Sequence, residues 1–409
     1  MRHIYSSLDI GSDRIKLIVC ELYKNKLNLL AATSTPSIGI KRGLITDAEA
    51  ARSSIKRAVE EVESMLGIKI NKIAVTVPSY RADFTLIKGS KKIENEASII
   101  TGEDVREVLN HAMTTKKQKG YEIVTSIPID FKVDDKNGVK EPRGLIASNI
   151  DVRSILVTVP DKNLISVLTV LESLNIEVVE ALINPISDIE VFKTEEIASS
   201  ISSIINIGHE TTTVSLYNKG ILIKNSILPI GSFNIDNDLA YIYKTTQKTA
   251  REVKENFALA HKRNASLNDF YETVNTLDEK IKISQFEASE IVMARLEEIL
   301  TLSRKEITNL TSSSIDNVII TGGISNMEDF EYIANDIFGK KCIIGNIKLL
   351  GIRSNAYSSA LGTIISFINR LKLTGKEYSM FGEEVPTGRE FTVEENSMLD
   401  KLFGYFSGD

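Results

Sequence analysis

One local pattern occurs twice in this chain, about half a chain length apart. Residues 7–14 read S-L-D-I-G-S-D-R, and residues 204–211 read I-I-N-I-G-H-E-T. In both copies an apolar strand precedes an Asp-Ile-Gly or Asn-Ile-Gly turn, and a second apolar strand, a polar turn containing lysine and a third strand follow. The offset from Asp9 to Asn206 is 197 residues, far longer than the ~20–50 residues of solenoid repeats. The sequence therefore predicts two related domains.

Composition limits the class of protein. The chain has 409 residues, 42% of them hydrophobic, enough for several cores at roughly 100–200 residues per domain. The formal net charge of −6 argues against a nucleic-acid-binding protein, whose binding surface is basic. Asp9 interrupts the N-terminus too early for a signal peptide, and no stretch approaches the ~18 apolar residues of a membrane span. We therefore expect a cytoplasmic protein.

The spacing of apolar residues divides the chain further. Each half begins with the repeated pattern and continues as an α/β domain. A helix is expected after Thr46, which has capping-box spacing to Glu49. From residue 81 to 160 short alternating strands surround one helix, which indicates a small α+β insertion. The expected domains are 1–80 with 161–195, the insertion 81–160, 196–232 with 315–375, and a mostly helical subdomain 233–314.

The end of the chain differs in composition from the rest. Residues 376–396 contain six acidic and two basic residues without periodicity, which is typical of a flexible linker. In residues 397–406 the apolar side chains recur at helical spacing and form one face of a short helix. Such a helix must bury that face on a membrane interface, on a partner or on the chain's own body. The apolar residues are Met398, Leu399, Leu402, Phe403 and Phe406.

The repeated turn has a specific physical use. Gly11 lets the backbone approach a phosphate closely, and successive N–H groups of such a turn bind anions. The hydroxyl of Ser12 can donate to a phosphate oxygen, and Asp9, at the end of a strand, can hold a hydrated Mg²⁺ ion. A further apolar strand, V-I-I-T-G-G at residues 318–323, ends in a Gly-Gly turn. Together the three turns favour phosphate binding over three ordinary turns.

This set of turns, in this order and spacing, resembles the actin-like ATPase superfamily, in which ATP with Mg²⁺ lies between two related domains. The match is closer to the FtsA family of bacterial cell-division proteins and covers nearly the whole chain. Residues 37–47 (S-I-G-I-K-R-G-L-I-T-D), 127–135 (I-P-I-D-F-K-V-D-D) and 228–240 (L-P-I-G-S-F-N-I-D-N-D-L-A) resemble segments of that family. The resemblance implies an α/β, actin-like (ribonuclease-H-like) fold of two lobes, with the α+β subdomain inserted in the first lobe.

The resemblance also implies a set of ATP contacts. Asp9 would hold Mg²⁺ through a water, and Arg14 stands where the family usually has lysine. Lys254 would lie near the nucleoside, and the Gly-Gly turn would lie against the adenine and ribose. The implied cofactor-binding residues are Asp9, Gly11, Ser12, Arg14, Gly208, Thr211, Thr212, Lys254, Gly322 and Gly323.

The second turn departs from the family pattern D-I-G-G-G-T-T-D. Asn206 stands where an Asp is expected to orient the attacking water or the metal, and His209 and Glu210 replace two glycines. The Glu210 carboxylate would repel phosphates, by ~1 kcal/mol at ~4 Å in water and by more when desolvated. Arg251 also replaces a Glu usual near the nucleoside. Two interpretations stay open: bound ATP with weak or absent hydrolysis, or a scaffold without nucleotide. No catalytic residue is assigned.

By resemblance, the chain is expected to tether the FtsZ ring to the inner face of the cytoplasmic membrane at the division site. Its expected partners are the C-terminal tail of FtsZ, membrane lipids bound by residues 397–406, later division proteins and further copies of itself in filaments. The FtsZ tail would bind within residues 233–314, and residues 81–160 would contribute to filament contacts. The alternatives are an ATP-hydrolysing enzyme or kinase of the superfamily, against which Asn206 argues, and a pilus-assembly adaptor, which lacks such an amphipathic end.

Overall fold

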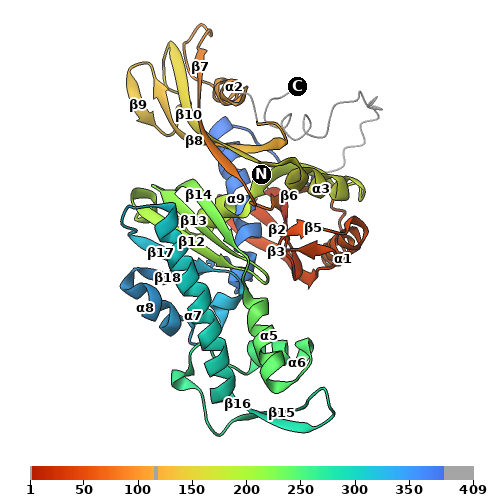
Figure 1. Cartoon of the computed structure of the whole chain (residues 1–409). Helices are drawn as coiled ribbons and strands as arrows, with labels where there is room; N and C mark the ends of the chain where they lie inside the picture. Colours follow the sequence, from red (N-terminus) through yellow and green to blue (C-terminus); the bar gives the residue numbers. More distant parts are fainter. Residues whose placement is uncertain (1, 115–117, 382–409) are drawn as a thin grey trace.

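The computed structural model describes residues 2–114 and 118–381. Two five-stranded sheets form the centres of two lobes (Figure 1). The strands of the first sheet are β1 (Arg2–Ile10), β2 (Arg14–Tyr23), β3 (Lys26–Pro36), β6 (Lys72–Val77) and β11 (Glu177–Ile183). Those of the second are β12 (Ile201–Ile207), β13 (Thr212–Asn218), β14 (Ile221–Leu228), β17 (Asn317–Thr321) and β18 (Cys342–Ile344).

The two sheets have the same topology. Their orders are β11-β6-β1-β2-β3 and β18-β17-β12-β13-β14. In each, the leading strand pairs antiparallel with the next strand and parallel with a later one. The duplication predicted from the repeated turn is therefore confirmed. The second half of β1 is buried without alternation, as in a strand covered on both faces by helices.

Helices α1 (Ala48–Leu66), α3 (Asp161–Glu172), α4 (Asn184–Phe192) and α9 (Ser358–Thr374) surround the first sheet, beside a small hairpin of β4 (Ile40–Lys41) and β5 (Leu44–Ile45). Asp47 caps α1 by accepting a hydrogen bond from the backbone N–H of Ala50 (3.1 Å). The cap expected at Thr46 is wrong, because the Thr46 hydroxyl donates to the carbonyl of Gly39 instead. Gly67 ends the helix in the left-handed conformation, as its position predicted.

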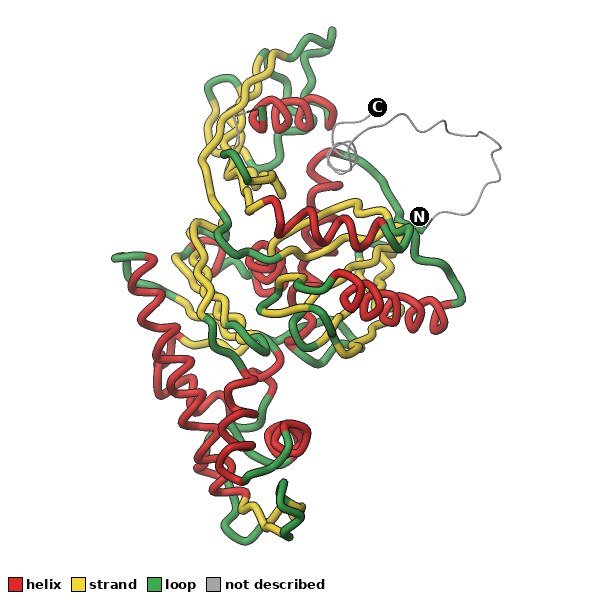
Figure 2. Tube along the Cα trace, turned by 45° about the vertical axis from the view of Figure 1, so that its right-hand side comes forward, coloured by secondary structure: helices red, strands yellow, loops and turns green. Residues whose placement is uncertain are grey.

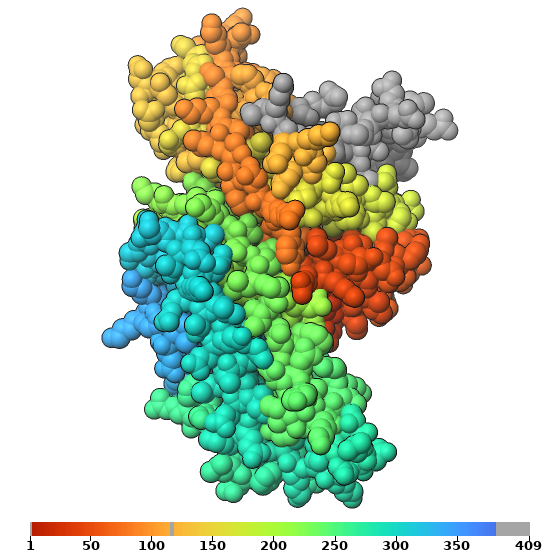
Figure 3. All heavy atoms as spheres, in the orientation of Figure 1, coloured from red at the N-terminus to blue at the C-terminus, as the bar shows by residue number. Residues whose placement is uncertain are grey.

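The insertion forms a separate body at one end of the molecule (Figure 3). Its four-stranded sheet has the order β7-β10-β8-β9, from β7 (Asp83–Lys92), β8 (Tyr121–Val133), β9 (Lys136–Val139) and β10 (Asn149–Pro160). One helix, α2 (Gly102–Met113), packs on this sheet at the position expected from the sequence. A capping box between Thr101 and Asp104 starts it.

The opposite end is helix-rich, as expected, and also carries a hairpin that the sequence pattern did not indicate (Figure 2). It contains α5 (Ser232–Tyr243), α6 (Gln247–Asn256) and α7 (Gln285–Leu310), with β15 (Phe270–Val274) paired to β16 (Lys280–Ser284). Helix α8 (Phe330–Phe338) packs on α7. Short 3₁₀ turns lie at Ile197–Ser199, Lys262–Asn264, Gly323–Asn326, Gly339–Lys341 and Asn355–Tyr357.

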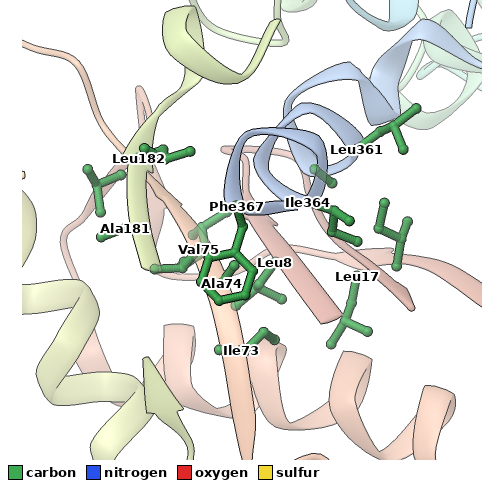
Figure 4. Close-up of a cluster of buried hydrophobic side chains, with 14 of the residues drawn as sticks. Leu8, Leu17, Ile73, Ala74, Val75, Ala181, Leu182, Leu361, Ile364 and Phe367 are labelled. Carbon is green, nitrogen blue, oxygen red and sulfur yellow. The ribbon is translucent and has the colours of Figure 1, made fainter. Parts of the chain in front are cut away.

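Helix α9 returns to the first lobe, although the sequence division placed residues 315–375 in the second. Leu361, Ile364 and Phe367 pack over Leu8 and the neighbouring strands (Figure 4). Helix α9 also crosses α4 closely, since a Cβ on Gly362 would lie 1.7 Å from the backbone oxygen of Ser187. The division was wrong here because a helix follows the apolar surface available to it, which sequence order does not reveal.

The segment after α9 also departs from expectation at its start. The linker was expected from residue 376, but Met380 donates its backbone N–H to the carbonyl of Ile4 (2.9 Å), and Ser379 accepts from the N–H of Ile4 (3.0 Å). The packed body therefore continues to Phe381. The rest of the expected linker and the expected amphipathic helix, residues 397–406, lie outside the described residues. Within the described part of the chain, no helix is both long and apolar enough to span a bilayer.

Candidate functional site

The two copies of the repeated turn face each other across a cavity of about 580 Å³ between the lobes. Most of the residues implied by the resemblance line it: Asp9, Gly11, Ser12, Arg14, Gly208, Thr211, Lys254, Gly322 and Gly323. Thr212 does not, because it is fully buried and its hydroxyl donates to the carbonyl of Ile230 (2.8 Å). Alternate residues of a strand face opposite sides, so Thr213 lines the cavity in its place.

The first turn holds a nearly buried carboxylate. Asp9 accepts hydrogen bonds from the ammonium of Lys16 (2.9 Å), the hydroxyl of Thr76 (2.9 Å) and the amide of Asn184 (3.1 Å). The three donors come from β2, β6 and α4. The sequence pattern did not single them out. At Gly11 an added Cβ would lie 2.8 Å from the carbonyl of Arg14. The turn is therefore tight and its carboxylate firmly oriented.

The second turn is joined to the start of α5. The carbonyls of Gly208 and His209 accept hydrogen bonds from the N–H groups of Ser232 (2.9 Å) and Phe233 (2.8 Å). Gly231 approaches the turn so closely that an added Cβ would lie 2.5 Å from the carbonyl of His209. The His209 and Phe233 rings lie 5.0 Å apart. His209, which replaces a glycine of the family pattern, is thus packed against α5.

Several contacts bridge the cleft. The Arg251 guanidinium in α6 donates to both carboxylate oxygens of Asp13 (2.6 and 2.5 Å), and the His209 ring lies 3.9 Å from the same carboxylate. Burial alone would raise the pKa of Asp13, but the Arg251 hydrogen bond and the neighbouring charges hold it below its usual value. Glu210 accepts a hydrogen bond from the backbone N–H of Arg42 in the other lobe. Glu210 therefore contacts the facing lobe through its carboxylate.

Lys254 is only 3% exposed, although it lines the cavity. Its ammonium lies 2.6 Å from the carboxylate of Asp236 in α5. Burial raises the pKa of Asp236, and the Lys254 charge opposes that rise. The lysine thus ties α6 to α5 beneath the cavity, a partner that its spacing in the sequence did not predict.

Asn206 occupies the end of β12, on the cavity wall. Its side-chain N–H group donates to the carboxylate of Asp188 in α4 (2.7 Å), which also accepts from the hydroxyls of Ser358 and Ser359 (2.8 Å each). Burial raises the pKa of Asp188 to about 6, although these donors favour its ionised form. Asp188 was not predictable from the sequence, because an acidic residue inside an apolar helix forms no recognisable motif.

The Gly-Gly turn lies beside the second phosphate-type turn. Gly322 has a φ of +97°, and a Cβ there would lie 2.2 Å from the carbonyl of Ile207. Only glycine combines this conformation with so close an approach. The next residue, Gly323, has open space, since an added Cβ would meet only the Ala356 Cβ at 3.7 Å. The turn thus closes the cavity with backbone instead of side chains.

Comparison with known proteins agrees with this architecture. The profile described as Cell division protein FtsA matches residues 203–362, and the profile described as SHS2 domain inserted in FTSA matches residues 83–158. Cell division protein FtsA of Bacillus subtilis (strain 168) is 27% identical over 376 residues, which cover 91% of this chain and 86% of that protein. FtsA of Streptococcus pneumoniae serotype 2 is 26% identical over 358 residues, covering 87% and 78%.

Solved structures show the same fold at low identity. The PilM-PilN type IV pilus biogenesis complex aligns with a TM-score of 0.59 at 16% identity, covering 90% of this chain and 98% of that one. MreB5 of Spiroplasma citri bound to ADP aligns with a TM-score of 0.57 at 14% identity, covering 91% and 98%. The fold is thus the actin-like α/β fold with a small inserted subdomain. With both profiles and these relatives, the chain belongs to the FtsA family of cell-division proteins.

Proposed function

We propose that this FtsA-family protein binds ATP with Mg²⁺ in the cleft between its lobes. The cavity of about 580 Å³ falls within the ~300–1,000 Å³ of small-molecule sites. Gly11 and Gly322 bring backbone to its surface, and Arg14 and Lys16 line the phosphate end. MreB5 of Spiroplasma citri, which shares the fold, was solved with ADP and with AMPPNP bound. These features support the interpretation with nucleotide over the empty scaffold.

The donor set also fits Mg²⁺. Asp9 offers carboxylate oxygens oriented by three donors, and hard cations such as Mg²⁺ bind one or two carboxylates through their remaining waters. Bound Mg²⁺ would supply charge compensation for the phosphates. Asn206 cannot accept a proton from an attacking water, so we propose weak or absent hydrolysis. Titration of the protein with ATP, with and without Mg²⁺, tests binding, and phosphate release tests hydrolysis. No binding at millimolar ATP would favour the empty scaffold.

We propose that the protein tethers the FtsZ ring to the cytoplasmic face of the membrane. Membership of the FtsA family carries this proposal, and the amphipathic pattern of residues 397–406 supports it. In a vesicle flotation assay the full chain should float, and a chain ending at Glu395 should not. Phe403→Asp should behave like the truncation, since it places a charge on the apolar face. Equal flotation of all three would exclude this anchor.

The FtsZ tail is proposed to bind the helix-rich end. The turn of the β15–β16 hairpin is tied to the end of α5 by a hydrogen bond from the N–H of Thr276 to the carbonyl of Lys244 (2.8 Å). Large apolar side chains are exposed around this junction, which favours a partner surface. They are Tyr241, Ile242, Phe270, Val274 and Leu277.

A pull-down with an FtsZ C-terminal tail peptide tests this site. Tyr241→Ser, at a side chain that is 85% exposed, should lower capture without altering stability. Leu350→Ser, at a side chain that is 94% exposed in the segment between β18 and α9, is the matched control and should bind normally. Equal capture of all variants by the peptide would show that the FtsZ tail binds elsewhere.

Filament formation and recruitment of later division proteins complete the proposal, with the insertion taking part in contacts between copies. Sedimentation of the full chain on vesicles with ATP, compared with a chain lacking residues 83–158, tests the filament.

Two simple assays address the alternative functions. Fast phosphate release would favour an enzyme, and flotation only in the presence of a membrane-protein peptide would favour an adaptor of the pilus-assembly kind.

A further inference from the structure

Asp188 is a buried carboxylate at the crossing of α4 and α9. It is 2% exposed, and its oxygens accept three hydrogen bonds from side chains of two other elements. Ser358 and Ser359 donate from the first residues of α9, and Asn206 donates from the end of β12. A carboxylate at this depth is tolerated only when donors surround it. Asp188 therefore joins the second turn of the cleft to the helices that connect the lobes.

This contact explains the amide at position 206. The distance from the Asn206 Nδ2 to the Asp188 Oδ2 is 2.7 Å. An Asp at position 206 would place two carboxylates in contact, and like charges at such a distance cannot both ionise in a buried site. A neutral side chain at position 206 is therefore compatible with the buried Asp188 carboxylate. Asn206 and Asp188 form a complementary amide–carboxylate pair.

The same contact sets the direction of the amide. A carboxylate only accepts hydrogen bonds, so the Asn206 side chain must turn its Nδ2 toward Asp188. Asn206 itself lines the cavity, so we place the Oδ1, the other polar atom of the amide, on the cavity side. Within residues 2–114 and 118–381, no donor forms a hydrogen bond with that Oδ1. An acceptor oxygen is therefore available at the end of β12, opposite Asp9 at the end of β1.

We infer that Asp188 is a positioning residue, which holds Asn206 with its Oδ1 toward the cleft as a neutral acceptor for water bound to Mg²⁺. This inference rests on the proposed binding of ATP with Mg²⁺. A neutral amide orients such a water and accepts no proton from it. The second turn is accordingly built to hold a hydrated ion without supplying a base.

The test measures ATP affinity by calorimetry in Mg²⁺ and again in EDTA, for the full chain and for Asp188→Asn. Loss of the oriented amide should weaken ATP binding in Mg²⁺ about tenfold, the usual effect of removing a residue that orients a metal ligand. Affinity in EDTA should change less than about twofold. Glu180→Gln, which alters a buried carboxyl in the first lobe, is the control and should keep both affinities. Equal weakening in Mg²⁺ and EDTA, or none, overturns the positioning role.

A charge-swapped pair gives an independent readout. Asn206→Asp alone should lower the melting temperature by several degrees, because two carboxylates then meet. The double variant Asp188→Asn with Asn206→Asp should recover most of that loss, since an amide at 188 can accept from both serines and donate to the new carboxylate. An Asn206→Asp protein as stable as the unaltered chain overturns the pairing. If the unaltered chain binds no ATP, the proposed function fails and the water-holding role with it, while the melting temperatures still decide whether Asp188 dictates the amide.

Discussion

Asp13 and Arg251 form a two-pronged ion pair across the cleft, with nitrogen–oxygen distances of 2.6 and 2.5 Å. Asp13 belongs to the first turn and Arg251 to α6, so the pair links the two lobes directly. Arg251 also donates to Glu255, one helical turn further along α6 (2.8 Å). The cleft is thus bridged by the chain's own charges next to the first phosphate-type turn.

We predict opposite effects from removing the two partners. Asp13→Asn should strengthen ATP binding roughly 5-fold to 10-fold, because a carboxylate beside the phosphates is lost and the guanidinium keeps only Glu255 as a charged partner. Arg251→Ala should weaken binding by a similar factor, because the Asp13 carboxylate then faces the phosphates without the two hydrogen bonds from Arg251. Fluorescence titration at low and high salt measures both effects, which should shrink in high salt. A change of the same sign in both variants would contradict this account.

Glu210 contacts the other lobe through the Arg42 N–H, and its carboxylate is expected to repel the nearby phosphates. Glu210→Gly should raise ATP affinity about fivefold, since the ~1 kcal/mol repulsion between unit charges disappears. Glu210→Gln keeps an oxygen that can accept from the Arg42 N–H but removes the charge, so it should retain most of the gain. Calorimetric titration of both variants with ATP separates the effect of the Glu210 charge from that of its contact with Arg42. No gain in either variant would show that the carboxylate does not face the phosphates.

The buried Glu180 carboxyl should make stability depend on pH. Burial raises its pKa from 4.5 to about 7, against the opposing charge of Arg370 (3.3 Å). The folded chain therefore keeps this proton between about pH 4.5 and 7, while the unfolded chain has lost it. The free energy of unfolding should fall as pH rises through that window, by roughly 3 kcal/mol for the full shift.

Urea denaturation at several pH values measures this slope. Asp188 contributes in the same direction up to about pH 6, and His209, whose pKa is lowered by burial, contributes with the opposite sign. The contribution of Glu180 is therefore the difference in slope between the unaltered chain and Glu180→Gln from pH 6 to 7. In Glu180→Gln the slope over that interval should flatten. An equal slope in both proteins would assign the pH dependence to another group.

The crossing of α4 and α9 should not tolerate a side chain at position 362. Gly362→Ala places a Cβ 1.7 Å from the carbonyl oxygen of Ser187, so the helices must separate, at a cost of about 3 kcal/mol. Gly323→Ala, where the nearest atom would be 3.7 Å away, is the control and should leave the urea midpoint unchanged. Equal midpoints for both variants would mean that the crossing relaxes freely.

Much of the site was predictable because its signals are local. The two turns are recognisable from a few adjacent residues each, and their repetition predicted the duplicated sheets that β1 and β12 now show. The insertion and its helix at Gly102–Met113 follow from strand alternation and a cap within one turn. Patterns of this kind depend on backbone geometry over a few residues.

Long-range contacts decided the rest. Asp13 and Arg251 are 238 residues apart, and α9 packs on the first lobe because its apolar face fits β1, not because of its place in the chain. Thr212 was assigned to the cavity from a motif, yet strand alternation turned it inward and brought Thr213 to the surface. The sequence by itself determined the turns, strands and duplication, whereas only the tertiary structure decided which side chains meet, since side-chain partners are selected by packing and burial across elements that local patterns do not connect.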